Sequence, residues 1–99
     1  MVDLSVIEGF DWDGGNARKS LDRHGVTQAE AEQVFSNEPL LAMDVKHSQD
    51  EPRFHALGQS TEGRYLHVTF TLRMNNTKIR VISARDMNRK ERVIYEQKT

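Results

Sequence analysis

The stretch YLHVTFTLR, residues 65–73, alternates apolar with more polar side chains along its whole length. Successive side chains of an extended strand point to opposite faces, so this alternation predicts a strand that is buried on one face only. The buried face comprises Leu66, Val68, Phe70 and Leu72. Asn75 and Asn76 then favour a hairpin turn. The stretch KIRVISAR, residues 78–85, therefore predicts a second strand, antiparallel to the first.

The segments before this hairpin predict two further strands and two helices. Strands are expected over residues 40–46 and 53–59, separated by a polar turn at 47–51. A helix over 14–24 has Asp13 as its N-cap and Gly25 just past its end. Thr27 and Glu30 form a capping box, which predicts a second helix over 28–36 that buries Ala31, Val34 and Phe35.

The remaining ends of the chain complete the expected fold. Asn88 opens a basic helix that runs to about residue 97, whereas residues 1–9 are expected to be a loosely ordered lead-in. The fold class is then α+β, with two N-terminal helices, a four-stranded antiparallel meander and a C-terminal helix. We expect one domain over residues 1–99, with the helices on the Leu66 face of the sheet and the opposite face left for chemistry.

Composition narrows the class of protein. The chain has no cysteine, which excludes disulfides and thiolate chemistry. We see neither a signal peptide nor an apolar run long enough for a membrane, so a cytoplasmic protein is expected. The net charge of −1 conceals a polarity, because residues 1–52 carry 4 Lys and Arg against 11 Asp and Glu, and residues 73–99 carry 8 against 3. Either the basic part meets a polyanion or an acidic partner, or the two parts pair within the molecule.

Arginines on the strands are the main candidates for chemistry. No glycine-rich phosphate loop, local metal motif or serine elbow is present, and no cofactor or metal is expected. Cleavage of RNA by its own 2′-hydroxyl needs no metal, only a base, an acid and cations at the phosphate. Guanidinium groups bind phosphate oxygens bidentately. The four candidates are Arg53, Arg73, Arg80 and Arg85. The alternative for each is an edge arginine paired with a carboxylate.

Proton donors and acceptors are less well defined by the sequence. His24 precedes Gly25 at a helix end and acts either as a cap or in proton transfer. Glu51 is either a base or a solvated turn residue, and Tyr95 either catalytic or a packing residue. His55 and His67 lie on adjacent strands, as acid and base or as cross-strand neighbours. Further basic residues that could contact RNA phosphates, or simply be solvated, are Lys78, Arg89, Lys90 and Arg92.

Several segments together resemble the BrnT toxin family. FDWD at 10–13 and RHGV at 23–26 are similar to its F-x-W-D … K-H-G-V opening, and residues 29–35 match the spacing of its E-A-x-x-V-F helix. EPRF at 51–54, followed by Gly58, resembles E-x-R-F … G. FTLR at 70–73 and IRVISAR at 79–85 resemble F-T-x-R and R-I-I-S-A-R. Residues 91–92 and 95–96 fit its closing E-R … Y-E, so the resemblance spans about residues 10 to 96.

The resemblance implies a RelE-like fold and metal-independent RNA cleavage that stops translation. It also implies neutralisation in a hetero-oligomer with a BrnA-like antitoxin, whose ribbon-helix-helix part would bind DNA, so that the toxin itself would meet DNA only indirectly. Departures from the family pattern occur at Gly14, Asn16, Ser20 and Met87. The alternative they suggest is a catalytically inactive, toxin-like module that only binds an antitoxin.

Overall fold

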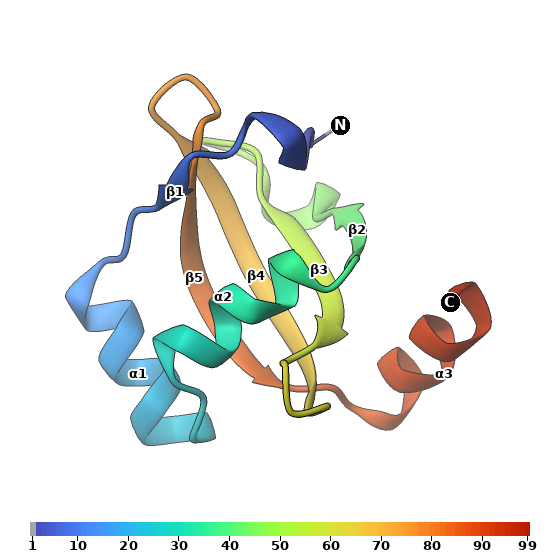
Figure 1. Cartoon of the computed structure of the whole chain (residues 1–99). Helices are drawn as coiled ribbons and strands as arrows, with labels where there is room; N and C mark the ends of the chain where they lie inside the picture. Colours follow the sequence, from blue (N-terminus) through green and yellow to red (C-terminus); the bar gives the residue numbers. More distant parts are fainter. Residues whose placement is uncertain (1) are drawn as a thin grey trace.

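The computed structural model describes residues 2–99 and has three α-helices and a five-stranded sheet (Figure 1). The helices are α1 (Gly14–His24), α2 (Gln28–Ser36) and α3 (Arg89–Lys98). The strands are β1 (Gly9–Phe10), β2 (Leu40–Met43), β3 (Phe54–Gln59), β4 (Tyr65–Arg73) and β5 (Lys78–Asp86). Two short 3-10 helices, η1 (Leu4–Val6) and η2 (Val45–His47), complete the list. The α+β class is therefore confirmed.

The sheet has one strand more than expected and is mixed. Its order is β1-β5-β4-β3-β2, with antiparallel pairs throughout β2 to β5 and a parallel pair between β1 and β5. The expectation of a four-stranded antiparallel sheet was wrong because a strand of two residues carries no alternation to read. The lead-in is likewise more ordered than expected: η1 and β1 lie within it, although residue 1 is outside the described part of the chain.

The local signals for the helices near the N-terminus were correct. Asp13 accepts hydrogen bonds from the first backbone amides of α1, and Gly25 ends this helix with a φ of 64°, where glycine is favoured. Thr27 and Glu30 form the expected capping box. The strand expected over 40–46 ends earlier, at Met43, because Asp44 caps the 3-10 helix η2.

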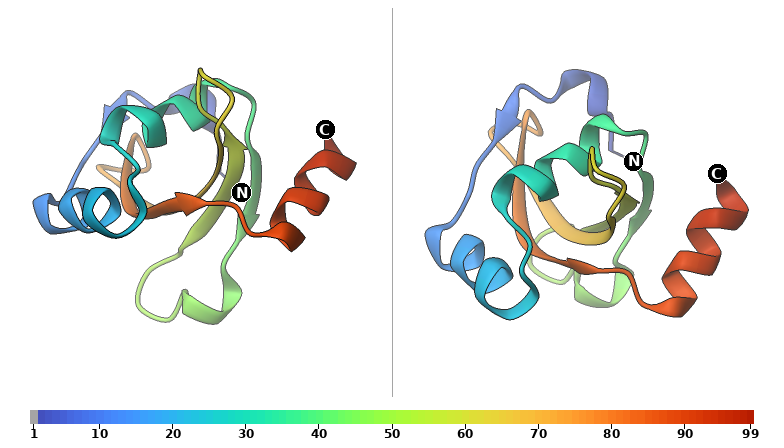
Figure 2. Two further views of the ribbon diagram at one scale, coloured as in Figure 1. Left: turned by 90° about the horizontal axis from the view of Figure 1, so that it is seen from below. Right: turned by 60° about the horizontal axis from the view of Figure 1, so that its bottom comes forward.

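The core lies between the sheet and the pair α1 and α2. Figure 2 shows these two helices on one side of a curved sheet, with α3 standing apart beyond the end of β5. Leu66, Val68 and Phe70 are fully buried against Val34 and neighbouring side chains, as the alternation predicted. In contrast, α3 packs Tyr95 edge-on against Tyr65, on the opposite face of β4, so the helices do not all cover the same face. No helix within residues 2–99 has the length and apolar character to cross a membrane.

An irregularity in β5 decides which arginines share a face. Thr69 pairs with Ser83 and Phe70 with Val81, so Ile82 is an extra residue between them. In a regular strand Arg80 and Arg85, five positions apart, would point to opposite faces. Because the extra residue Ile82 shifts the alternation by one position, both arginines lie on the face away from α1 and α2.

Candidate functional site on the open face of the sheet

The face of the sheet opposite α1 and α2, called the open face below, carries most of the polar strand residues. The cross-strand registers place them in rows: His55 beside Thr69 and Ser83, His67 beside Arg85, and Thr71 beside Arg80. Side chains of directly paired residues lie on the same face. His55 and His67, whose relative sides the sequence left undecided, therefore lie together.

A groove of about 490 Å³ lies across the α3 end of this face. We call it the histidine groove. Six of its lining residues matter below: Asp44, Arg53, His55, His67, Arg85 and Glu91. They come from the segment after β2, the segment before β3, the three central strands and α3. Of the sequence-based candidates, only Arg53 and Arg85, together with the two histidines, line this groove.

Asp44 and His55 form the central pair of the groove. His55 Nε2 lies 3.1 Å from Asp44 Oδ2, and Thr69 Oγ1 lies 3.3 Å from His55 Nδ1. The same carboxylate oxygen is 2.9 Å from His47 Nδ1. Burial acts to raise the pKa of Asp44, but hydrogen bonds from His47 and the positive charge of protonated His55 and His47 outweigh it and lower that pKa. Asp44 is thus an ionised anchor for both imidazoles.

His67 lies beside His55 but is more deeply enclosed. The two imidazole centres are 4.6 Å apart, and the side chain of His67 is only 9% exposed. Burial lowers the pKa of His67 to about 4, and the charge of Arg85 acts in the same direction. His67 Nε2 is 3.6 Å from a Glu91 oxygen, whereas its buried Nδ1 has no hydrogen-bond partner within the described residues. At neutral pH this imidazole is uncharged.

The two arginines of the groove differ in their partners. Arg85 binds Glu91 through two hydrogen bonds of 2.8 Å, and this carboxylate raises the pKa of the guanidinium. Glu91 is held in turn by the capping box at the start of α3. Within residues 2–99 no ion pair involves Arg53. Its guanidinium is the available cation beside the two histidines.

The other two strand arginines lie at the far end of the open face. Arg73 pairs with Glu51 and Arg80 with Asp11, the latter at 3.0 Å. The hydrogen bond from Arg73 lowers the pKa of Glu51, and the charges of Arg53 and Arg80 contribute to the same shift. Glu51 is therefore ionised within a group of arginines, and the alternative of carboxylate pairing holds for Arg73, Arg80 and Arg85.

The remaining candidates lie outside the groove. His24, at the end of α1, is near Asp86, and its carbonyl accepts a hydrogen bond from Arg64. Tyr95 is buried against Tyr65. Lys78 faces Arg73 across the β4–β5 hairpin.

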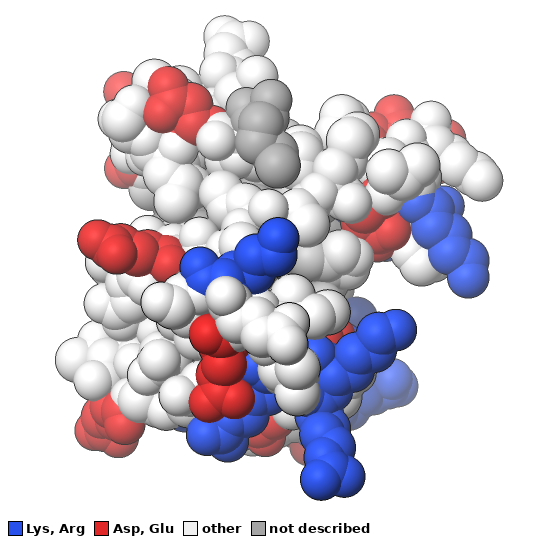
Figure 3. Space-filling model, turned by 90° about the vertical axis from the view of Figure 1, so that its right-hand side faces the viewer, with Lys and Arg blue, Asp and Glu red and all other residues white. Residues whose placement is uncertain are grey.

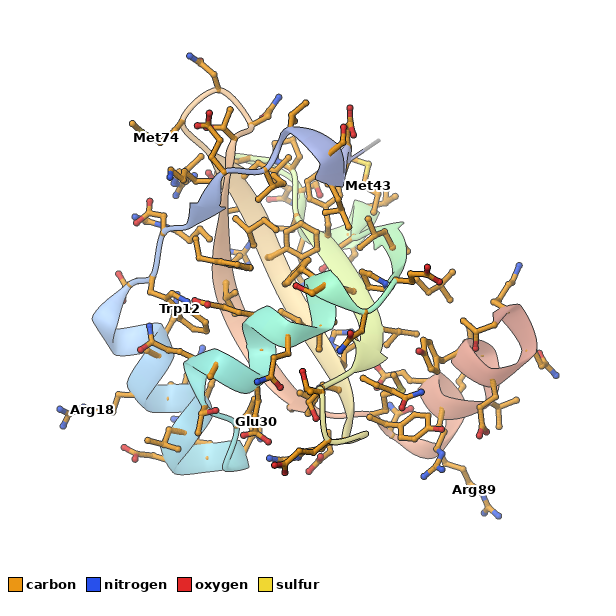
Figure 4. All side chains as sticks on the ribbon, in the orientation of Figure 1. Trp12, Arg18, Glu30, Met43, Met74 and Arg89 are labelled. Atoms are coloured by element: carbon orange, nitrogen blue, oxygen red, sulfur yellow. The ribbon has the colours of Figure 1, made fainter. Side chains whose placement is uncertain are left out.

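The basic residues of α3 gather on one side of the molecule. Figure 3, which looks onto the α3 side, shows several Lys and Arg side chains together in its lower half. Arg89 points away from the body there (Figure 4), and Lys90 is exposed next to it. Arg92 lies over the Tyr65 ring, 4.0 Å from its centroid. These residues form a rim beside the groove rather than part of its floor.

Asp44, Thr69 and Glu91 are groove residues that sequence reasoning did not select. The sequence does not mark Asp44 because residues 40–46 predict one continuous strand, although the spacing from Asp44 to His47 is a capping signal. Glu91 was available as the third helical residue after Asn88. Nothing in the sequence singles out Thr69. Within residues 2–99 no group of three or more His, Asp or Glu side chains is placed to hold a metal ion.

Two kinds of comparison with known proteins find similar proteins, and a third finds none. A family model described as the ribonuclease toxin BrnT of type II toxin–antitoxin systems matches residues 12–91. The fold is similar to a crystal structure of the ribonuclease toxin BrnT from Brucella abortus, with a TM-score of 0.59 at 20% identity. That alignment covers 82% of this chain and 97% of the Brucella chain. No curated protein sequence matches the chain.

Proposed function

The chain belongs to the BrnT family of ribonuclease toxins of type II toxin–antitoxin systems, and from this membership we propose that it is an endoribonuclease that cuts RNA on the open face. Cleavage uses the 2′-hydroxyl of the RNA itself, requires no metal, and halts translation. Because the proposed cleavage halts translation, the place of action is the cytoplasm. The observation that carries the proposal is the histidine groove, which is lined by three imidazoles and two guanidiniums.

Arg53 and Arg85 are the proposed ligands of the phosphate that is cut. Both line the groove beside the histidines, and guanidinium groups stabilise the extra charge that develops on a phosphate during displacement. Among the described residues Arg53 pairs with no carboxylate, whereas Arg85 exchanges Glu91 for a phosphate oxygen. A phosphate offers the guanidinium the same bidentate geometry as the carboxylate, so the exchange replaces one charged pair with another.

The outer cations are proposed to bind phosphates on either side of the cut. Arg73 and Arg80 extend the open face beyond Arg53, towards the β4–β5 hairpin. On the other side the α3 rim follows the groove. The proposed RNA contacts of this rim are Arg89, Lys90 and Arg92. At the opposite, hairpin end of the open face, Lys78 is a further proposed contact. Glu51, His24 and Tyr95, put forward for proton transfer from the sequence, lie outside the groove.

A protein antitoxin of the BrnA kind is the proposed partner. Type II systems pair the toxin with a protein, and an acidic segment of such a partner would complement the arginines of the open face and the α3 rim. Covering these groups would block RNA and form a hetero-oligomer. Contact with DNA is then made by the antitoxin and not by this chain.

The test combines growth with purified protein. Induced expression of the wild-type chain should arrest growth, and the purified chain should cut RNA in the presence of EDTA. Arg85→Gln and Arg53→Gln should each relieve the arrest, while Arg18→Gln, on the exposed side of α1, should not. Wild-type protein that cuts RNA only with an added divalent metal would contradict the metal-independent reaction.

A second candidate is a toxin-like module that binds an antitoxin without cutting RNA. The observation in its favour is that Arg73, Arg80 and Arg85 all hold carboxylates already. Against it, the departure at Ser20 is structurally used: this buried hydroxyl accepts a hydrogen bond from the Ala84 amide at 3.1 Å and ties α1 to β5. Tight antitoxin binding without any RNA cleavage or growth arrest would favour this candidate.

A further inference from the structure

We propose that His55 accepts the proton of the attacking 2′-hydroxyl and that Asp44 positions it for this step. The inference rests on the proposed function and names its proton acceptor. It selects His55 from the sequence-based candidates for proton transfer, since His24, Tyr95 and Glu51 do not line the histidine groove.

Asp44 fixes which nitrogen of His55 is free to act. Its carboxylate lies 3.1 Å from Nε2, and this negative charge favours a proton on Nε2 over one on Nδ1. Nδ1 is then the lone-pair nitrogen, and among residues 2–99 its hydrogen-bond partner is the Thr69 hydroxyl at 3.3 Å. A hydroxyl at that distance forms a weak bond that the 2′-hydroxyl of RNA can replace. The side chain of His55 is 31% exposed, which leaves the ring accessible from the groove.

The neighbouring His67 makes His55 the better acceptor. At 9% exposure and with a pKa of about 4, His67 stays neutral while its neighbour takes up a proton, so the two rings do not repel each other. Because His67 is a neutral imidazole at neutral pH, its remaining N–H is too weak an acid to protonate the leaving oxygen. The charged and titratable groups that face His55 are Asp44, His47, Arg53, His67, Arg85 and Glu91. Of these groups, the Asp44 carboxylate pairs with His55 and stabilises the imidazolium formed in the reaction.

The proposed reaction is an internal transesterification, in which the 2′ oxygen replaces the 5′ oxygen on phosphorus. His55 Nδ1 takes the proton from the 2′-hydroxyl, and the 2′ oxygen forms a bond to phosphorus. The bond between phosphorus and the 5′ oxygen breaks, and that oxygen takes a proton from water. Arg53 and Arg85 bind the two remaining phosphate oxygens. The products are a 2′,3′-cyclic phosphate and a 5′-hydroxyl, and His55 returns its proton to solvent.

The first test measures cleavage and binding separately on the full-length chain. His55→Gln should lower the single-turnover rate on a short RNA by about 100-fold or more, the range of a lost general base. Affinity for the same RNA with 2′-O-methyl groups, which cannot react, should stay at the wild-type value. Arg18→Gln is the control and should change neither quantity. His55→Ala should regain part of its rate when imidazole is added, which a folding defect would not allow.

The second test uses the pH profile to separate positioning from packing. The wild-type rate should fall on the acidic side as His55 becomes protonated. Asp44→Asn removes the carboxylate that favours the protonated ring, so its acidic limb should move to lower pH while its maximal rate drops. An unshifted limb, or a wild-type rate that does not fall in acid, would overturn the inference.

The two proposals fail in different ways. Wild-type protein that cuts no RNA under any condition removes both the proposed function and this inference. Wild-type protein that cuts RNA, alongside a His55→Gln variant that cuts it equally fast, removes only the role of His55.

Discussion

Arg64 joins three elements through one guanidinium. Its Nε and Nη2 bind the Asp86 carboxylate at 2.8 and 3.1 Å, at the end of β5. The same group donates to the carbonyls of His24 and Gly25 at the end of α1, at 3.1 and 2.8 Å, and to Glu30 in α2. The carboxylates raise the pKa of Arg64, which stays charged. No sequence pattern marked this residue, because its partners are distant in the chain.

We expect Arg64→Met to lower the free energy of unfolding by about 2 kcal/mol, because two helix-terminal carbonyls lose their donor. Arg64→Lys should fall between this variant and the wild type, since an ammonium group cannot reproduce the planar fork. Urea unfolding followed by circular dichroism measures the difference. Arg18→Met, at an exposed position of α1, is the matched control and should be close to wild type. Equal stabilities for the Arg64 and Arg18 variants would contradict the joining role.

The enclosed His67 should make stability depend on pH. Its pKa falls from an ordinary 6.5 to about 4 in the folded chain, mainly through burial. Between these values the unfolded chain binds a proton that the folded chain does not, so stability falls as the pH is lowered through this window. We expect the free energy of unfolding of His67→Leu to decrease less over this window than that of the wild type, by up to about 3 kcal/mol. Urea midpoints of both proteins measured across the window give the comparison, and parallel curves would disprove it.

At the scale of elements, Gly58 sets how closely β3 approaches α2. A Cβ atom at this position would lie 2.9 Å from Val34 Cγ1 and 3.4 Å from Pro39 Cβ. We expect Gly58→Ala to destabilise the fold by about 1–3 kcal/mol, the usual cost of overpacking. Gly14→Ala is the control: its Cβ meets nothing within 4 Å, and alanine favours the helix. The melting temperature should therefore fall for Gly58→Ala, whereas for Gly14→Ala it should rise or stay the same.

The elements that the sequence predicted correctly are those with local signals. The caps of α1 and α2 and the alternation of β4 each lie within a few neighbouring residues, so pattern alone places them. The bulge at Ile82 and the parallel strand β1 depend on pairing between distant segments. The same limit applies to the site. The sequence alone made Arg53, Arg85, His55 and His67 candidates, but it did not predict that they line one groove.

At the scale of the whole molecule, charge and architecture separate the two faces of the sheet. The acidic N-terminal half of the chain supplies α1 and α2, which cover one face. The basic C-terminal part supplies β5 and α3, which border the histidine groove on the other. Even so, Asp11, Asp44 and Glu51 from the acidic half neutralise much of the open face. The proposed RNA-binding surface therefore offers only some of its cations to phosphate groups.

This arrangement makes the salt dependence of RNA binding a measure of where RNA lies. Each phosphate neutralised on a single strand adds about 0.7 to the slope of log K against log salt. We expect Arg85→Gln and Arg53→Gln each to reduce that slope by about this amount, measured with 2′-O-methyl RNA to prevent cleavage. Arg18, which Figure 4 shows pointing outward from α1, is the control. If Arg18→Gln reduced the slope and the groove variants did not, RNA would lie on the helical face, and the assignment of the open face would be wrong.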